Sequence, residues 1–316
     1  MKSARICLLA AAVLGGGIGL AAAEYPERPI IFQVPFGAGG GTDVAARTYA
    51  PYLEKCLGAG AELVVINKPG ASGQLGFAEL ANSEPDGYMI STLNAPNFEI
   101  GAITGTAYKL DQFELLGNIV GTNVTLVVKK DSPIKTLADL VEAAKNASTP
   151  INIGTASLGA EDHLTGLRFA KMAGVEFSTL PLESAGNVRN AVIGGHIQVG
   201  SLSNNETAPF RDQLHVLASA TPERLPEMQD VPTFREQGFD LVAGSNHVLG
   251  TKAGVPEEIR AKLAGCIEQV AKDPAFLEDA KKRSVSLNPM NAEEVKAFIA
   301  KEHSDLEELW KTEPWQ

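Results

Sequence analysis

Short apolar runs alternate with segments of helical periodicity along most of this 316-residue chain. The run Ile30–Val34 predicts a strand, and apolar positions at helical spacing predict a helix over Thr42–Leu57. The same order returns at once, with a strand at Glu62–Ile66, a short helix at Gln74–Ala81 and a strand at Tyr88–Thr92. Two consecutive strand–helix–strand units predict a parallel, doubly wound α/β sheet.

A second series of strands and helices follows "NAPN" and a less regular stretch. The segment "NVTLVVKKDSP" predicts a strand, a helix is expected over Leu137–Asn146, and "INIGTASLGAEDHLTGLRFAKMAG" opens further units of the same kind. From "AGVPEEIRAKLAGCIEQVAKD" onward the pattern is helical. Two α/β halves with a similar order of elements predict two lobes with a cleft between them.

The first 23 residues have the pattern of a secretory signal. Lys2 and Arg5 precede the apolar run Ile6–Leu20, and the small residues Ala21–Ala23 follow. The run is shorter than the roughly 20 apolar residues that a membrane-spanning helix needs. Cys7 stands too early to be a lipid-modified cysteine at the cleavage point. We therefore expect a soluble, exported protein without a lipid anchor.

The mature protein is expected to begin at Glu24, because cleavage of such a signal follows small residues. Intact-mass measurement of protein recovered from the periplasm checks this. An uncleaved or acylated N-terminus would contradict it.

The chain is acidic, with 27 Lys+Arg, 38 Asp+Glu and a formal net charge of −11. Removal of the signal takes away Lys2 and Arg5, which leaves 25 Lys+Arg and a net charge of −13. Bulk charge therefore excludes binding to nucleic acid or to an anionic membrane surface. An anion would have to be bound through local dipoles.

Two cysteines remain after the signal. Cys56 and Cys266 each end or lie within an apolar stripe at helical spacing, so both should face a core. Export permits a disulfide between them, but buried thiols are also common. The sequence leaves both alternatives open.

The glycine cluster in "VPFGAGGGTDVAAR" fits neither nucleotide-binding fingerprint. A dinucleotide motif aligned on Gly37 and Gly39 needs glycine where Thr42 stands, and a P-loop needs Lys-Ser/Thr where Thr42 and Asp43 stand. The second strand ends in "LVVINKPG", without the acidic residue of a ribose-binding site. We therefore expect no nucleotide site.

Three loops rich in glycine and other small residues each follow a strand and open a helix. They are "GAGGGTD", "PGASGQ" and, in the second half, "GTASLGAED". Such loops leave backbone N–H groups uncovered at the positive end of a helix, which is an anion-binding arrangement. Any one of them alone is as well explained as a tight turn. Since the carboxyl ends of parallel strands share one edge, three together favour a common site for a carboxylate or another small anion.

Two polar residues in these loops have open roles. Asp43 either caps its helix and complements the dipole, or binds a ligand ammonium or amide. His163 either donates a hydrogen bond to a ligand or packs. The acidic pairs Glu161-Asp162 and Glu257-Glu258 lie in first helical turns, where the dipole favours them, and are not acid/base candidates.

Catalytic and metal-binding arrangements are lacking in the sequence. No two of the five histidines have metal-ligand spacing, and no GxSxG precedes an Asp and a His in hydrolase order. We expect no enzyme activity, no organic cofactor and no metal.

The chain resembles the periplasmic receptors of tripartite tricarboxylate transporters, the Bug receptors. The resemblance rests on "YPERPI", "VPFGAGGGTDVAAR", "NKPGASGQLGFAELANSEPDGY", "LPEMQDVPTFREQGF" and "AGVPEEI", and it covers nearly the whole mature chain in order. It implies a type II periplasmic binding protein fold, in which two doubly wound lobes enclose a ligand cleft. The implied divisions are a signal over 1–23, a first lobe over 24–123 and 248–316, and a second lobe over 124–247. Hinges are expected near Thr122–Leu126 and Ser245–Leu249.

The resemblance also implies a set of ligand-binding residues. In the first lobe these are Phe36, Gly37, Ala38, Gly39, Gly40, Thr42, Asp43, Ala71, Ser72, Gly73 and Asn94; in the second they are Thr155, Ser157, His163, Ser201 and Asn204, with Asn205 beside them. The chain departs from the family pattern at Glu183, where Lys is usual, and at Gln198, where Asp is usual.

The function implied is capture of a small organic mono-, di- or tricarboxylate by a monomeric receptor that delivers it to membrane permease subunits. One alternative is a receptor that hands its liganded form to a sensor kinase. Another is an exported enzyme acting on a small organic acid, which would need a nucleophile–base pair or a metal site. The ligand itself is not identified by the sequence.

Overall fold

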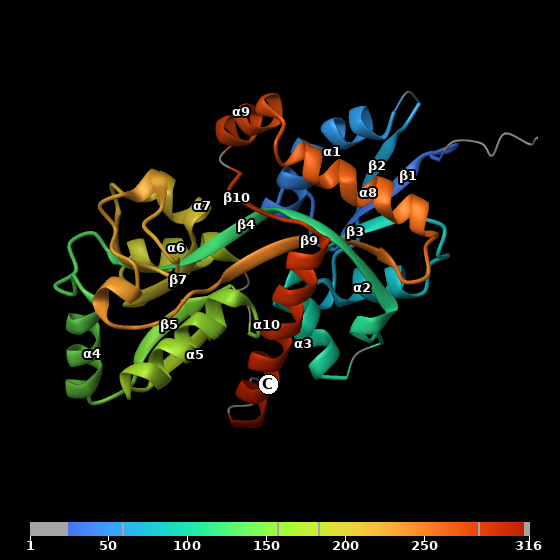
Figure 1. The fold of residues 1–316 in the computed structure, drawn as a ribbon. Helices are drawn as coiled ribbons and strands as arrows, with labels where there is room; N and C mark the ends of the chain where they lie inside the picture. Colours follow the sequence, from blue (N-terminus) through green and yellow to red (C-terminus); the bar gives the residue numbers. More distant parts are fainter. Residues whose placement is uncertain are drawn as a thin grey trace, which may run out of the picture.

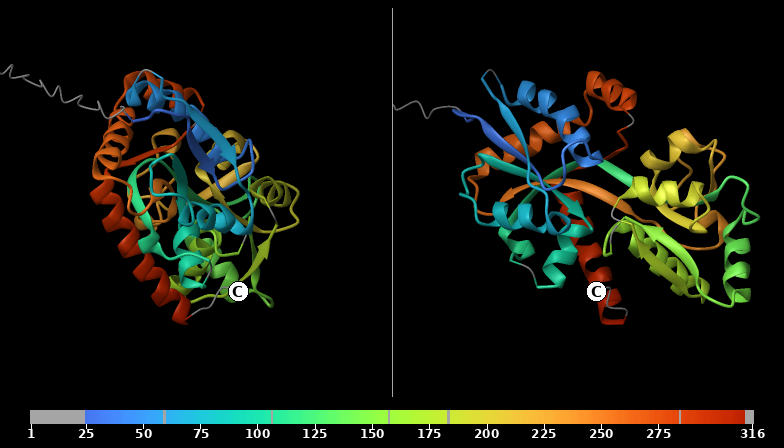
Figure 2. Two further views of the ribbon diagram at one scale, coloured as in Figure 1. Left: turned by 90° about the vertical axis from the view of Figure 1, so that its right-hand side faces the viewer. Right: turned by 180° about the vertical axis from the view of Figure 1, so that it is seen from behind.

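The structure is a computed structural model that describes residues 25–58, 60–105, 107–156, 158–182, 184–283 and 285–312. The expected signal and the start at Glu24 lie outside these residues. Figure 1 shows two groups of elements that are joined by two long strands, β4 (Phe113–Lys129) and β9 (Gly244–Lys252). Figure 2 shows the same two groups from behind. The fold is α/β, as expected, but the sheet is mixed and not purely parallel, because the crossing strands β4 and β9 run antiparallel to their neighbours.

The first group is built on the strands β1 (Ile30–Val34), β2 (Leu63–Asn67) and β3 (Met89–Ala95), which are parallel in the order β2-β1-β3. Strand β9 continues this sheet as the antiparallel neighbour of β3. The helices of the group are α1 (Gly41–Leu57), α2 (Gln74–Ala81), α3 (Asn97–Ile103), α8 (Glu257–Val270), α9 (Pro274–Lys282) and α10 (Ala292–Thr312), and β10 (Leu287–Met290) pairs with β4.

The second group contains the parallel order β7-β5-β6, with β8 on the other side of β4. Its strands are β5 (Ile151–Thr155), β6 (Phe177–Pro181), β7 (Val199–Ser203) and β8 (Leu214–Ser219), and its helices are α4 (Leu137–Asn146), α5 (Glu161–Ala173), α6 (Ala185–Ile193) and α7 (Asn204–Thr207). A separate buried apolar cluster around Leu126, Phe169 and Phe234 forms its core.

Strand β4 changes partner between the two groups. Asn123 pairs with Gly244 of β9, whereas Val124 pairs with Ser203 of β7. The chain crosses back just before β9, because Ala243 still donates to the carbonyl of Ala220 in the second group. The two groups therefore meet where two adjacent strands change neighbours.

The sequence prediction failed between Pro96 and the centre of β4. That stretch, expected to be irregular, contains α3 (Asn97–Ile103), and β4 begins at Phe113 instead of near Asn123. The first part of β4 is buried on both faces and carries two irregularities in its pairing with β9, so its sequence lacks the period-2 alternation of a regular strand. Outside this stretch the strand Ile30–Val34 and the helices Gln74–Ala81 and Leu137–Asn146 have the bounds expected.

A disulfide joins Cys56 near the end of α1 to Cys266 in α8, which settles the alternative left open by the sequence. Both helices cover the same side of the first sheet, together with Tyr49, Leu53 and Ile267 in one apolar cluster. The bond therefore links the N-terminal part of the first group to its C-terminal helices.

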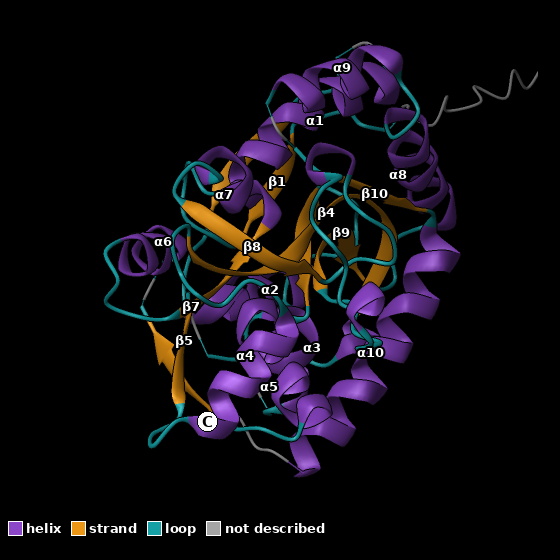
Figure 3. Ribbon diagram, turned by 90° about the vertical axis from the view of Figure 1, so that its left-hand side faces the viewer, coloured by secondary structure: helices purple, strands orange, loops and turns teal. Residues whose placement is uncertain are grey.

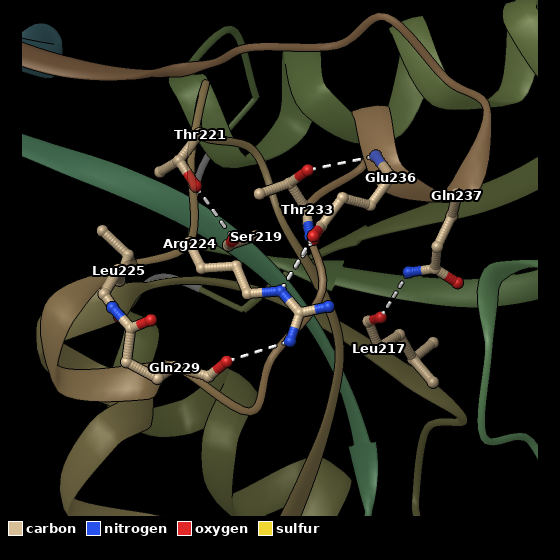
Figure 4. Close-up of polar contacts among 9 residues, drawn as sticks. All are labelled: Leu217, Ser219, Thr221, Arg224, Leu225, Gln229, Thr233, Glu236 and Gln237. Carbon is tan, nitrogen blue, oxygen red and sulfur yellow. Dashed lines mark hydrogen bonds and ion pairs between the residues drawn. The ribbon is translucent and has the colours of Figure 1, made fainter.

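The motif "LPEMQDVPTFREQGF" has a structural role in the second group. Arg224 binds both Glu236 and the carbonyl of Gln229, Glu236 accepts from the Thr233 N–H, and Gln237 donates to the carbonyl of Leu217 on β8 (Figure 4). These bonds fasten a long connection with little regular structure against the sheet.

Among the described residues, no helix has both the length and the apolar character needed to cross a membrane.

Candidate functional site

The first glycine loop lies between β1 and α1, with Gly37 to Gly41 exposed. Gly39 has a φ of +77°, a conformation that favours glycine, and its N–H donates to Asp43 Oδ2 at 2.8 Å. The first-turn N–H groups of Gly41, Thr42 and Asp43 have no carbonyl partner within a helix, and they make no hydrogen bond to the described residues. These three N–H groups are free donors at the start of the helix.

Asp43 holds this loop in place. Its carboxylate accepts from the Gly39 N–H, from Arg47 Nε at 2.9 Å and from Asn67 Nδ2 at 2.9 Å, and the side chain is buried. Burial alone would raise the pKa of Asp43, but the bonds from Arg47, Gly39 and Asn67 outweigh it and lower that pKa. The geometry corresponds to a structural role, since both oxygens are engaged by the protein, but Asp43 fastens the loop and makes no capping bond to the helix.

The second loop is a short 3₁₀ turn, Ala71–Gly73, between β2 and α2. Ala71 and Ser72 have φ values of +47° and +53°, which is uncommon for residues with a side chain and costs roughly 1–3 kcal/mol each. A Cβ on Gly73 would lie 2.8 Å from the Phe77 ring and 3.1 Å from the Phe36 ring. The close approach of these rings therefore requires glycine at position 73.

Hydrogen bonds connect the two loops to the end of β3. Asn94 Nδ2 donates to Thr42 Oγ1 at 3.0 Å, Asn97 Nδ2 donates to the Ser72 carbonyl at 3.4 Å, and Asn67 Nδ2 donates to the Phe36 carbonyl at 3.0 Å. The structure thus brings together Phe36, Gly37, Ala38, Gly39, Gly40, Thr42, Asp43, Ala71, Ser72, Gly73 and Asn94, as parallel strands with adjacent carboxyl ends require.

His247 is a polar residue of this region that sequence reasoning missed. It lies opposite Asn94 in the β3–β9 pair, its side chain is buried, and neither its Nδ1 nor Asn94 Oδ1 has a hydrogen-bond partner among the described residues. Burial lowers the pKa of His247 to about 4, so the ring is neutral at pH 7. No local motif marks His247, because a long-range strand pairing places it there.

The loop between β5 and α5 repeats the geometry of the first loop. Gly159 has a φ of +79°, and Ala160 (φ −77°, ψ 168°) matches Gly40 (φ −74°, ψ 166°). In both loops the left-handed glycine donates its N–H to the side chain four residues later, here His163 Nδ1 at 2.9 Å. The two groups thus present the same backbone arrangement.

His163 occupies the position in α5 that Asp43 occupies in α1. Because its Nδ1 accepts from Gly159, the proton of the neutral ring is on Nε2. Burial lowers the pKa of His163 to about 4, so the ring is a neutral donor at pH 7. Thr155 is buried at the end of β5, and Ser157 lies outside the described residues.

Ser201 and Asn204 are buried and bonded to other elements. Ser201 Oγ donates to the Asp162 carbonyl at 2.8 Å. Asn204 Oδ1 accepts from the Asn123 N–H, and its Nδ2 donates to Glu227 and to Ser286 Oγ, which in turn donates to Asn205. In this arrangement Asn204 joins α7 to the crossing strand β4 and to the C-terminal segment before β10.

Of the two departures from the family pattern, Glu183 lies outside the described residues, and Gln198 is exposed and accepts from the Asn152 N–H at 3.4 Å. In the described part of the chain no group of three His, Cys, Asp or Glu residues could hold a metal ion. A pocket of about 610 Å³ lies elsewhere, between α5, α10 and the segment 235–242.

Comparison with known proteins gives a consistent assignment. Residues 45–312 match the family model of the tripartite tricarboxylate transporter family receptor. A UPF0065 protein of Agrobacterium vitis is 32% identical over 288 residues, which cover 88% of this chain and 81% of that protein.

Solved structures agree with this match. A solute-binding protein of the same receptor family from Polaromonas, solved without ligand, has a TM-score of 0.79 and 27% identity, over 91% of this chain and 99% of its own. Two Rhodopseudomonas palustris proteins, MatC with bound malate and another with adipate, have TM-scores of 0.77 and 0.78. MatC is 23% identical to this chain, and the match covers 90% of this chain and 99% of MatC. The protein with adipate is 24% identical, and the match covers 91% of this chain and 98% of that protein. At these identities the two structures show the fold alone. The match over most of its length shows that this chain belongs to the receptor family of the tripartite tricarboxylate transporters.

Proposed function

We propose that this protein is a periplasmic receptor that captures a small organic carboxylate between two lobes and delivers it to the permease subunits of a tripartite tricarboxylate transporter. The observation that carries the proposal is the repeated geometry of the loops before α1 and α5. Each lobe directs the positive end of a helix from the end of a parallel strand, and in the first lobe the N–H groups of the first helical turn are unpaired.

The ligand carboxylate is bound mainly by backbone N–H groups in the first lobe. Gly41, Thr42 and Asp43 supply the free donors, and the exposed loop gives a ligand access to them. Ser72 and Asn94 border the same place, and in the second lobe His163 Nε2 is the neutral donor. Malate and adipate, bound by the two Rhodopseudomonas palustris proteins, are the first candidates because both are small dicarboxylates.

A thermal-shift screen against mono-, di- and tricarboxylates and acidic amino acids tests the proposal. A ligand at 100 times its dissociation constant adds about 2.7 kcal/mol to the free energy of unfolding. A hit is then titrated by calorimetry in the presence and absence of EDTA, with unchanged affinity expected. No stabilisation by any carboxylate would contradict the proposed function.

Ligand binding is also expected to compact the protein by closure of the lobes. The first lobe comprises the chain up to Asn123 and from Gly244 onward, and the second is residues 124–243, so the second crossing lies a few residues before the expected 247/248 boundary because β9 pairs with β3 and β4 from Gly244 on. The hinge is where β4 changes partner at Asn123 and Val124. Small-angle scattering with and without a saturating ligand measures the radius of gyration. Equal dimensions would indicate a rigid receptor.

A further inference from the structure

The two lobes touch through three helices beside the proposed ligand site. Ile100 of α3, Leu164 of α5, and Leu306 and Leu309 of α10 form one buried apolar cluster. Figure 1 shows α10 between α3 and α5, and Figure 3 shows it along one side of the molecule. Leu164 directly follows His163, so this contact adjoins the loop that faces the ligand.

Carboxyl groups lie on the same helix faces as these apolar residues. Glu161 precedes Leu164 by three residues, Glu302 precedes Leu306 by four, and Glu99 precedes Ile103, which packs against the same cluster, by four. Residues three or four apart share one face of a helix. Glu99 is fully buried, and its carboxyl neighbours that of Glu302 across the contact between α3 and α10.

Two further carboxyl groups stand behind Glu161 in the second lobe. Ser201 binds the backbone of Asp162, and Ser203, two residues on along β7, donates to Glu206 Oε2 at 3.3 Å. The first turns of α5 and α7 therefore meet at the end of β7. Asp162 is only 7% exposed, and its Oδ1 has no hydrogen-bond partner among the described residues.

No cationic side chain forms a direct ion pair with these five carboxyl groups in the described part of the chain. No ion pair within the described residues includes Glu99, Glu161, Asp162, Glu206 or Glu302.

The charged neighbours act on the set only through longer-range interactions. Arg189 of α6 faces Glu206, while Arg168 of α5 and Lys301 of α10 face Glu302, and all three favour the ionised carboxylates. Asp305, on the same helix as Glu302, opposes them. Protonation of the carboxyl groups reduces the negative charge that these cations leave.

Burial and mutual repulsion raise the pKa values of these carboxyl groups. Burial, and then the charges of Asp162, Glu206 and Glu302, raise the pKa of Glu161 to about 8. Burial raises the pKa of Glu302 to about 6, and burial and the Glu302 carboxyl raise the pKa of Glu99 well above its ordinary value.

We propose that closure of the lobes is coupled to proton uptake by the carboxyl groups of Glu161 and Glu302, so that lower pH favours the closed receptor. The inference rests on the lobe closure proposed above. When the lobes separate, Glu161 and Glu302 no longer face each other and are more exposed to water, so both ionise more readily. When the lobes close, the two acids are brought together and protonation is favoured, while Glu99 stays beside Glu302 within the first lobe in both forms.

The sign and the pH window follow from the pKa values. In the closed form the pKa of Glu161 is about 8. Opening removes the Glu302 charge and the cover of the first lobe, while Asp162 and Glu206 stay beside Glu161, so the pKa of Glu161 falls. Between the open-form and closed-form values opening releases a proton, so the opening equilibrium constant rises by up to about tenfold per pH unit. Above about pH 8 both forms are ionised and the dependence ends.

Spin labels on the two lobes test this without any ligand. Cysteines replace the exposed Lys109 of the first lobe and Lys145 of the second, while native Cys56 and Cys266 are joined in a disulfide and do not react. Distance distributions from pulsed electron resonance between pH 5 and pH 9 are expected to show a growing open population up to about pH 8. The double variant Glu161→Gln, Glu302→Gln should stay closed at every pH.

The matched control is Glu142→Gln, the same change at an exposed site on α4. It should keep the pH response of the unmodified protein. Each single Gln variant should lose part of the response, so the test does not depend on the double variant alone. Circular dichroism confirms that each variant is folded.

Two results would overturn the coupling. One is a distance distribution that does not change with pH, and the other is an unaltered pH response in the double variant. Either leaves the proposed function intact if scattering still shows compaction with a ligand from the screen. Failure of the whole carboxylate panel would instead reject the proposed function.

Discussion

The variant Gly40→Val is expected to lose carboxylate affinity by at least 100-fold, or about 2.8 kcal/mol, while remaining folded. Gly40 has a φ of −74° and ψ of 166°, which any residue can adopt, so the substitution adds little backbone strain. Its Cβ would lie 3.2 Å from the Gly37 carbonyl, and the two further methyl groups would stand over the N–H groups that open α1. Gly39 is a poorer choice, because its φ of +77° would add strain of its own.

The experiment compares Gly40→Val with alanine variants of two basic side chains near the loops, Lys68 and Arg47. Lys68 is paired with Glu79 at 3.2 Å, and Arg47 is occupied with Asp43 and Asn67. Replacing either with alanine should therefore reduce affinity only modestly, since neutral backbone dipoles bind the anion, with or without bridging waters.

Calorimetry with the best carboxylate of the screen gives the three affinities, and denaturant unfolding gives the stabilities. A control for inserting valine at a glycine is Gly265→Val, an exposed position on α8 with no atom within 4 Å of its Cβ. If Gly40→Val bound normally and Lys68→Ala did not bind, a lysine and not the loop backbone would be the anion site.

Replacing Cys56 and Cys266 together with serine is expected to lower the free energy of unfolding by about 2–5 kcal/mol. The bond joins residues 210 positions apart and so removes much conformational freedom from the unfolded chain. It also fastens α8 to α1, whose packing completes the core of the first lobe. Ligand affinity should be nearly unchanged, because Cys56 lies 15 residues, or about 22 Å along the helix, from the loop at Gly41.

Denaturant unfolding of both proteins, with and without dithiothreitol, measures this effect. The reductant should bring the unmodified protein down to the stability of the double-serine variant and leave the variant unchanged. An unmodified protein whose unfolding midpoint did not move on reduction would show that the bond contributes nothing.

Local chemistry made much of the molecule predictable. The strand Ile30–Val34 and the helix Leu137–Asn146 could be predicted because each buries one strand or one helix face. The pattern of apolar residues that produces this burial lies within the element itself. Glycine clusters after strands likewise marked the loops before α1 and α2, where Gly39, Gly70 and Gly73 have positive φ values that favour glycine.

The sequence did not predict segments whose structure depends on contacts with distant parts of the chain. The first part of β4 is buried on both faces, so its sequence shows no alternation, and α3 is a seven-residue helix too short to show a period. The bond between Cys56 and Cys266, and the place of His247 opposite Asn94, depend on segments more than 150 residues apart.

By itself, then, the sequence determined the α/β class, the order of most elements and the glycine loops, because periodicity and turn chemistry act over a few residues, and its motifs carried the resemblance to the receptor family. Only the tertiary structure decided which polar groups are free. It engaged Asp43 and Asn204 with protein partners, left the N–H groups of the first turn of α1 unpaired, and gathered Glu99, Glu161 and Glu302 from three helices into one group of neighbouring acids. Burial and hydrogen bonding are properties of surroundings that distant parts of the chain supply, and these surroundings set the charge and availability of each group.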